Sequence, residues 1–436
     1  MTLQHVRGDA PPAPKPIGFW GCWSLVVGTM IGSGIFSVPA VLAPFGAVSF
    51  GGWLISAGGA ILIALTIGRL AGRTRRTGGL YVYTQDAFGD AAGFLIAWGY
   101  WASLTVAVPA VAIAFVGYLT VFIPRLTDAP VAQAAAALAL VWSLIGVALR
   151  GARNIRVTQI VLTILKLFPL VLIVVLGMAV GEPSYLSAAP LKTEPLPVAL
   201  SATALLTMWA FLGLETASMP AGDVDHPERT IARATIFGTA SVAAVYVACT
   251  LAVMMLIPLP QLAQSTAPFA DAIAGRGGSM LGDWGPYLIS AGALVAIAGT
   301  TNGSIFAASQ VMMAVAGDKL APAALARRNP AGAPYMALVI GGVVSSILLV
   351  ANYSRGLMGA FTFLLMMSTV TTLTALLAVA LAEVRASWRT AKGWAVVAGL
   401  ACCFAVFAIV GSGLETMAWG VVLMALGWPA YRWGRP

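Results

Sequence analysis

The chain has 436 residues, of which 60% are hydrophobic and only 9% are charged, and its mean hydropathy is +0.92. Soluble domains carry about a quarter charged residues, so this composition excludes a water-soluble enzyme. A membrane β-barrel would show alternating segments of about ten residues. Instead, 157–180 and 335–351 are near-continuous apolar runs of helical length. The composition therefore predicts an all-α polytopic membrane protein.

A window of about 19 residues predicts twelve membrane-spanning helices. Their approximate ranges are 17–44, 47–68, 87–122, 130–150, 155–180, 199–222, 232–257, 284–316, 334–352, 357–383, 394–411 and 415–431. Nineteen of the 24 Lys and Arg residues fall on one side of these spans and four on the other. Because basic residues accumulate in cytoplasmic loops, we predict that both termini are cytoplasmic and that the protein lies in the cytoplasmic (inner) membrane.

The same charge distribution explains the net charge of +9 as a topology signal and argues against nucleic-acid binding. Residues 1–16 are polar and proline-rich and are predicted to form a cytoplasmic tail, with the first helix as an uncleaved anchor. The four cysteines lie in apolar runs without metal-ligand spacing, so no metal and no cofactor is predicted.

Two ionisable residues lie deep inside predicted spans: Glu215 in the sixth and Lys166 in the fifth. An ionisable group at membrane depth is costly, so it generally faces a cavity or a partner. A structural role, with backbone carbonyls as partners, is the alternative for each. An enzyme would need paired carboxylates, histidines or a metal at that depth. One lone carboxylate and no intramembrane histidine argue against enzymatic catalysis.

Glycines interrupt the first and the sixth predicted helices. The first contains Gly32-Ser33-Gly34 at mid-span, and the sixth contains Gly213. Glycine leaves helical geometry at low cost. A break at Gly32 would free the amides of Ser33 and Gly34 at a helix N-terminus suited to a carboxylate, and a break in the sixth helix would expose carbonyls as acceptors for an ammonium. Tight packing of small residues is the alternative for either helix alone.

The first and sixth helices occupy corresponding positions in two consecutive five-helix units, which is typical of an inverted-repeat transporter. We therefore predict a first repeat over 17–180, a second repeat over 199–383, and two additional C-terminal helices over 394–431. A zwitterionic amino acid matches the donors of the first break and the acceptors of the second.

Several motifs in register carry a resemblance to a known family. They are Gly32-Ser33-Gly34-Ile35-Phe36, Trp209-Ala210-Phe211-Leu212-Gly213-Leu214-Glu215, Asp225-His226-Pro227-Glu228-Arg229, Ser265-Thr266-Ala267-Pro268-Phe269, Gly317-Asp318-Lys319-Leu320 and Val410-Gly411-Ser412-Gly413. The chain resembles the amino acid/polyamine/organocation transporters, within the basic amino acid/polyamine antiporter group typified by the arginine/agmatine antiporter. This resemblance implies a LeuT-like fold of 5+5 inverted repeats with helices 1 and 6 interrupted, and a homodimer embedded in membrane lipid.

The resemblance also assigns the substrate site. It places the substrate carboxylate at Ser33 and Gly34. It places the substrate ammonium at the carbonyls of Met30, Trp209 and Leu212, with the Trp209 ring closing over the substrate as a gate. Glu215 matches the family's acidic residue for proton sensing or amine binding, and Tyr100 matches an aromatic position near the gate and the pocket.

The pocket for the substrate side chain departs from the arginine antiporter. Ser304 stands where that protein has a stacking tryptophan, Val108 where it has an asparagine, and Thr29 replaces another asparagine. With Ser103, these residues predict a mildly polar, hydroxyl-containing pocket with an apolar wall. The choice between a basic or diamine substrate and a neutral amino acid therefore stays open.

Lys166 is a second departure from the arginine antiporter. In other members of the superfamily a lysine at this position replaces a sodium ion between helices 1 and 8. We hypothesise that the Lys166 ammonium bridges carbonyls of helix 1 and hydroxyls of helix 8. The sequence thus predicts a secondary active transporter of amino acids or their amine products, most favourably an antiporter working by alternating access. The alternative is a proton-coupled symporter or exporter of neutral amino acids on the same fold.

Overall fold

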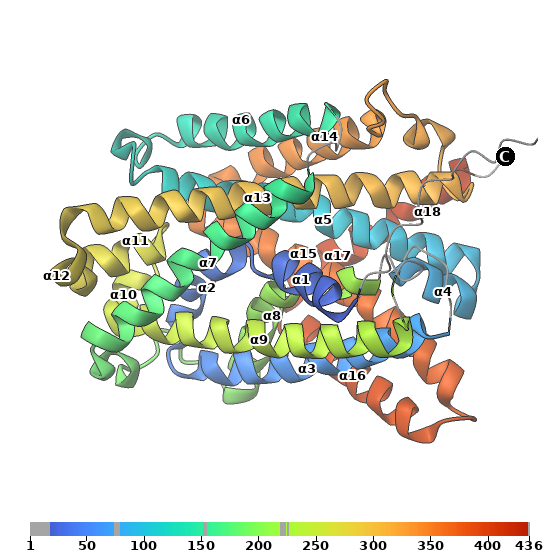
Figure 1. Cartoon of the computed structure of the whole chain (residues 1–436), viewed down its shortest axis with the longest axis horizontal. Helices are drawn as coiled ribbons and strands as arrows, with labels where there is room; N and C mark the ends of the chain where they lie inside the picture. Colours follow the sequence, from blue (N-terminus) through green and yellow to red (C-terminus); the bar gives the residue numbers. More distant parts are fainter. Residues whose placement is uncertain (1–17, 74–78, 151–154, 219–223, 225, 435–436) are drawn as a thin grey trace, which may run out of the picture.

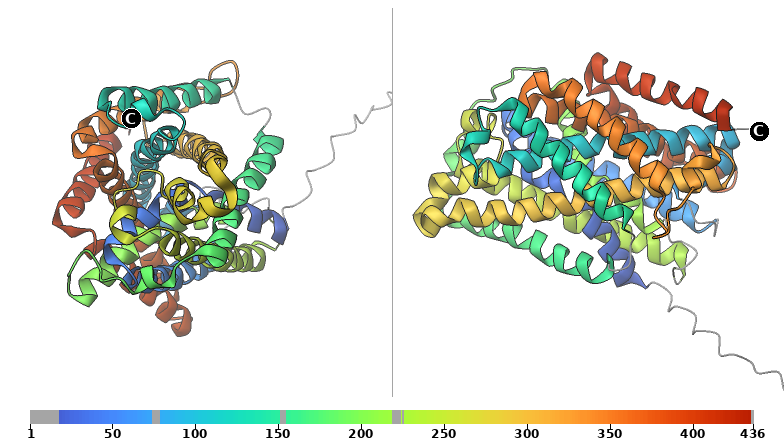
Figure 2. Two further views of the ribbon diagram at one scale, coloured as in Figure 1. Left: turned by 90° about the vertical axis from the view of Figure 1, so that its left-hand side faces the viewer. Right: turned by 90° about the horizontal axis from the view of Figure 1, so that it is seen from above.

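The computed structural model describes residues 18–73, 79–150, 155–218, 224 and 226–434. Every element with defined bounds in these residues is a helix. Most of the long helices run roughly along the long axis of the molecule (Figure 1), and the view down that axis shows them packed as a bundle (Figure 2). The predicted cytoplasmic tail, 1–16, lies outside the described residues.

The elements of the first half of the chain follow the predicted order. They are α1 (Phe19–Met30), α2 (Ser33–Leu42), η1 (Ala43–Phe45), α3 (Val48–Ala71), α4 (Leu80–Phe88), α5 (Asp90–Leu119), η2 (Pro124–Leu126), α6 (Pro130–Leu149), α7 (Ile155–Val180) and η3 (Pro183–Ser187).

The second half begins with a discontinuous helix and ends with another. Its elements are α8 (Leu196–Met208), η4 (Trp209–Phe211), η5 (Leu214–Ser218), α9 (Pro227–Leu256), α10 (Leu259–Leu262), α11 (Pro268–Ala272), η7 (Ile273–Gly277), α12 (Gly278–Leu281), η8 (Gly282–Trp284), α13 (Gly285–Gly317), η9 (Ala323–Ala326), α14 (Tyr335–Asn352), η10 (Tyr353–Arg355), α15 (Gly356–Ser387), α16 (Lys392–Val410), α17 (Gly413–Ala425) and α18 (Gly427–Gly434).

Eight helical stretches of the described chain are long and apolar enough to cross a membrane, and nine if the bent pair α1 and α2 forms one span. One of the eight, Tyr335–Ser387, contains both α14 and α15. The structure thus confirms the all-helical polytopic class. The number of twelve spans stays a prediction.

The structure differs from the predicted helices at two places. The expected helix 87–122 begins at Asp90, because Gly89 has φ +91° and separates α5 from the preceding short helix α4. The expected helix 415–431 is divided at Leu426 into α17 and α18. Neither difference moves a residue of the candidate site.

Close crossings between helices depend on glycine. A Cβ added at Gly68 of α3 would lie 2.7 Å from Ala232 Cβ and 2.9 Å from Ala232 Cα of α9. By contrast, a Cβ at Gly58 of the same helix would have no described atom within 4 Å. The two glycines therefore form a matched pair for a stability test.

We expect Gly68→Ala to destabilise the protein by about 1–3 kcal/mol, because α3 and α9 would have to move apart. Gly58→Ala removes the same flexibility without a clash, so it should leave stability unchanged or raise it by up to about 1 kcal/mol. Thermal unfolding of the two purified variants in one detergent measures the difference. Equal unfolding temperatures would contradict the close α3–α9 crossing.

An ion pair joins the end of α3 to the end of α15. Arg73 Nη1 lies 3.0 Å from Glu383 Oε2, and Arg73 Nη2 donates to Glu383 Oε1 at 3.1 Å and to Ser387 Oγ at 2.8 Å. The Glu383 side chain is completely buried. A buried carboxylate requires such a partner, since an unpaired charge away from water is strongly destabilising.

Candidate functional site

The first predicted break is found between α1 and α2. Ile31 and Gly32 are not helical, and the segments Phe19–Met30 and Gly34–Phe45 are inclined at 48°. A Cβ at Gly32 would lie only 2.8 Å from the Thr300 side chain of α13. Glycine is therefore required where the broken helix crosses α13, and the α2 N-terminus that follows has unsatisfied backbone amides.

The second predicted break is found after α8. The α-helix ends at Met208, and two 3-10 turns, η4 and η5, follow with Leu212 and Gly213 between them. Gly213 has φ +107°, which a residue with a Cβ adopts only with strain. A Cβ there would also lie 3.2 Å from the Thr29 side chain of α1. The two interrupted helices thus contact each other at their breaks.

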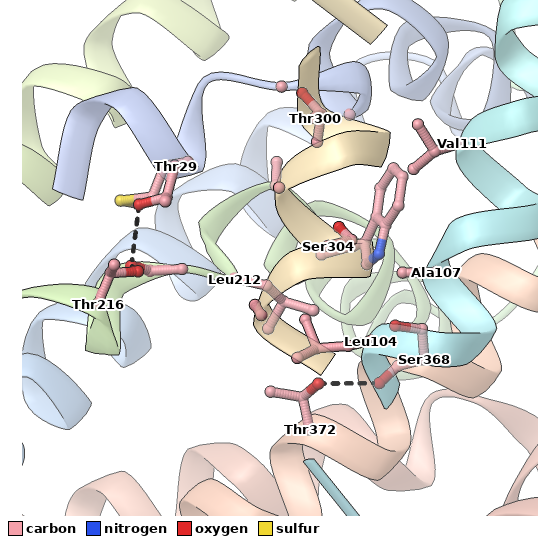
Figure 3. Close-up of a pocket in the computed structure, with 18 of the residues that line it drawn as sticks. Thr29, Leu104, Ala107, Val111, Leu212, Thr216, Thr300, Ser304, Ser368 and Thr372 are labelled. Atoms are coloured by element: carbon pink, nitrogen blue, oxygen red, sulfur yellow. Dashed lines mark hydrogen bonds between the residues drawn. The ribbon is translucent and has the colours of Figure 1, made fainter. Parts of the chain in front are cut away.

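A cavity of about 170 Å³ lies between these breaks (Figure 3). Its walls come from α1, α2, α5, α7, α13, α15 and the irregular segment after α8. Ten of the predicted site residues line it: Thr29, Met30, Gly34, Tyr100, Ser103, Lys166, Trp209, Leu212, Glu215 and Ser304. The structure therefore brings together residues that are up to 275 positions apart in the sequence, from Thr29 to Ser304. Their roles in binding stay predictions.

Two predicted site residues are placed differently. Ser33 begins α2, but its side chain lies outside the described part of the structure. Val108 does not line the cavity. It is buried with Val141 of α6 and Ile305 of α13 in a separate apolar cluster. Ala107 faces the cavity instead, because consecutive helical residues point about 100° apart.

Several lining residues were not predicted from the sequence. An apolar wall is formed by Leu104, Ala107 and Val111 of α5, which follow helical spacing. Thr216 lies beside the second break, and Ser368 and Thr372 of α15 complete the polar lining. The i, i+4 spacing of Ser368 and Thr372 places both on one face of a helix and could have indicated that they line the cavity. It does not single them out, because α15 also carries Thr at 369, 371 and 374.

The Glu215 carboxylate is held by donors from the protein. Tyr100 Oη donates to Glu215 Oε1 at 2.5 Å, and the Gly213 amide donates to Oε2 at 3.1 Å. The residue is only 1% exposed. Glu215 is therefore a buried, hydrogen-bonded carboxylate at the cavity edge, and Tyr100 is the side chain that positions it.

Lys166 borders the cavity from α7, which packs against α9 and α13. Its side chain is 4% exposed. Among the described residues, its ammonium has no hydrogen-bond partner and no carboxylate within 4 Å. The hypothesised bridge between carbonyls of α1 and hydroxyls of α13, the eighth predicted span, is therefore not formed among the described residues.

The Trp209 ring lies over the N-terminal end of α2. A Cβ at Gly34 would be 3.4 Å from Trp209 Cε3, and the ring packs edge-on against Phe361 of α15 with centroids 5.7 Å apart. Beyond α2, Tyr118 Oη donates to the Phe36 carbonyl at 2.8 Å and accepts from the Phe269 amide at 3.2 Å. The rings of Phe36, Tyr118 and Phe269 pack together where α2, α5 and α11 meet.

The Met30 carbonyl, at the end of α1, accepts a hydrogen bond from the buried Tyr246 hydroxyl of α9. This bond fixes the last carbonyl before the break. A carbonyl oxygen has two lone pairs, so one remains for a donor in the cavity.

Comparison with known proteins adds independent findings. A family model described as amino acid permease matches residues 17–419. The chain is 31% identical to a putative arginine/ornithine antiporter of Bacillus subtilis, with 96% of each chain covered. It is 31% identical to the cadaverine/lysine antiporter of Escherichia coli over 77% of this chain and 74% of that protein. It is 28% identical to the putrescine transporter PotE of Escherichia coli over 93% of each.

Proposed function

The chain belongs to the amino acid permease family, and on this premise we propose that it exchanges a basic amino acid for an amine across the cytoplasmic membrane. The resemblance identified from the motifs is confirmed. The protein is a multi-pass secondary transporter and not an enzyme. The observation that supports exchange of such substrates is the cavity between two interrupted helices, since a helix break leaves backbone amides and carbonyls without helical partners.

The proposed substrate pose follows from the breaks. The substrate carboxylate binds at the N-terminus of α2, at the amides of Ser33 and Gly34, where the helix dipole favours an anion. The α-ammonium binds the carbonyls of Met30, Trp209 and Leu212. The Trp209 ring then covers the substrate, and its face favours a cationic group.

The names of these relatives indicate the substrate class. One is a putative arginine/ornithine antiporter, one a cadaverine/lysine antiporter and one a putrescine transporter. All five compounds carry an amine or guanidine that is protonated at neutral pH. We therefore place the substrate of this chain among basic amino acids and their amine products.

The proposal includes twelve spans arranged as two inverted repeats of five with two further helices, both termini in the cytoplasm, and a homodimer in membrane lipid. The two interrupted helices, α1 with α2 and α8 with η4 and η5, rock around the substrate during alternating access. Antiport follows if the empty carrier reorients slowly, because then only loaded states cross the membrane.

A proton-coupled transporter of neutral amino acids is the second candidate. The observation that favours it is the buried Lys166 among the residues that line the cavity.

Counterflow in proteoliposomes tests exchange. We expect uptake of labelled lysine or arginine to require internal basic amino acid or diamine, and to exceed uptake into empty vesicles at least about tenfold. Protein-free liposomes and vesicles loaded with a neutral amino acid are the controls. Accumulation of neutral amino acids from a pH gradient alone, with no amine exchange, would establish the second candidate and refute the first.

A further inference from the structure

Hydroxyl groups dominate the polar lining of the cavity, and most of them donate their protons to the backbone. Six line it and donate to a backbone carbonyl: Thr29 to Leu25, Ser103 to Tyr100, Thr216 to Gly213, Thr300 to Ala296, Ser368 to Ser103 and Thr372 to Ser368. A hydroxyl that has given its single proton away offers only lone pairs to a ligand. These six hydroxyl groups of the lining therefore act as acceptors toward a ligand.

Three of these hydroxyls form one cluster between α5 and α15, which we call the hydroxyl cluster: Ser103, Ser368 and Thr372. Ser368 Oγ donates to the Ser103 carbonyl at 2.9 Å, and Thr372 Oγ1 donates to the Ser368 carbonyl at 3.1 Å. Figure 3 shows Ser368 and Thr372 together at one end of the cavity, away from Thr29 and Thr216. Each member is 1% exposed, so a ligand reaching the cluster leaves bulk water.

The charged groups of the lining do not compete for this cluster. Glu215 accepts from Tyr100 and from the Gly213 amide, so its carboxylate already has protein donors. Lys166 approaches from α7, which packs on α9 and α13, whereas the cluster lies between α5 and α15. A cationic ligand at the cluster would therefore meet neutral oxygen acceptors.

We propose that Ser103, Ser368 and Thr372 bind the distal ammonium of the substrate, so that the cavity selects primary amines such as lysine, ornithine or a diamine over guanidinium compounds. This inference rests on the proposed amine exchange and specifies its substrate class. An ammonium is a compact charge with three donors and no acceptor, which matches three oxygens that offer lone pairs. The methylene stem lies along Leu104, Ala107 and Val111.

A guanidinium fits the same end poorly. Its five donors lie in one plane and favour a carboxylate fork or an aromatic face. The cluster contains no carboxylate, and α13 presents Ser304 toward the cavity instead of a ring. A neutral side chain fits worse than an ammonium, because it would bury the three oxygens without a donor.

Thr372→Val tests the assignment, since valine keeps the shape of threonine and removes the oxygen. We expect the variant to raise the lysine KM for exchange about tenfold, as for loss of one hydrogen bond to a charged group. Thr371→Val is the matched control. Thr371 lies on the same helix and also donates to an i−4 carbonyl, that of Met367, but it does not line the cavity. Its lysine KM should stay within about twofold of the unmodified protein.

The unmodified protein should also prefer lysine to arginine, and cadaverine to agmatine, by about tenfold or more in KM. Arginine preferred over lysine, or a lysine KM unchanged by Thr372→Val in a protein that exchanges lysine at the normal rate, would overturn the selectivity while leaving amine exchange intact. Absence of exchange with every amine would overturn both proposals together.

Discussion

Lys166→Met is expected to lower amine exchange by about a hundredfold or more, equivalent to about 2.7 kcal/mol. Lys166 lines the cavity, and among the described residues its ammonium has no partner. A charge at membrane depth is costly and generally pairs with a partner or faces a cavity. We infer that a paired state arises during the transport cycle, when α1 moves toward α7, and that removing the charge blocks that step. Methionine keeps the length of the apolar stem, so packing of α7 is preserved.

Two further variants distinguish the effect of losing the Lys166 charge from an effect on folding. Leu167→Ala changes the next residue, whose side chain is 37% exposed on the outer surface of the bundle, and should leave exchange unchanged. Lys166→Arg keeps the charge and should retain more exchange than Lys166→Met. Reconstituted rates at several pH values, normalised to folded protein, give the comparison. Full exchange with the normal pH dependence in Lys166→Met would refute a role in transport.

Composition and glycine positions were sufficient to predict the helical class and both breaks. The apolar runs leave no other class, and Gly213 adopts a φ of +107°, which other residues reach only with strain. Gly32 is required by the close Thr300 side chain. The division of the last helix at Leu426 was missed, although Gly427 and Pro429 follow it closely and both residue types commonly interrupt helices.

It was harder to predict which face of a buried helix borders the cavity than to predict the helix itself. α5 is apolar on all sides, so its hydrophobic pattern gives no face. Val108 was assigned to the pocket through the resemblance, although Ala107 occupies it. The same holds for α15, whose Thr and Ser residues are spread around the helix. Only the packing of α5 against α15 shows that Ser368 and Thr372, rather than Thr369 or Thr371, border the cavity.

Glu215→Gln is expected to flatten the pH dependence of exchange. Tyr100 Oη and the Gly213 amide both donate to the carboxylate, and it borders the cavity with 1% exposure. A carboxylate in this position can bind a proton in one conformation and release it in another, whereas glutamine has the same shape and cannot. If one proton accompanies each cycle, the rate should change about tenfold per pH unit in the unmodified protein and by less than about twofold in the variant.

Tyr100→Phe is the control for Glu215→Gln, since it removes one hydrogen bond and keeps the ionisable group. Its pH profile should move along the pH axis and keep its slope. Proton uptake measured with a pH-sensitive dye during lysine exchange gives a second readout, because a purely structural role for Glu215 would lower the rate equally at every pH. An unchanged slope and unchanged proton uptake in Glu215→Gln would exclude this carboxylate as the coupling group and would direct the search to Lys166.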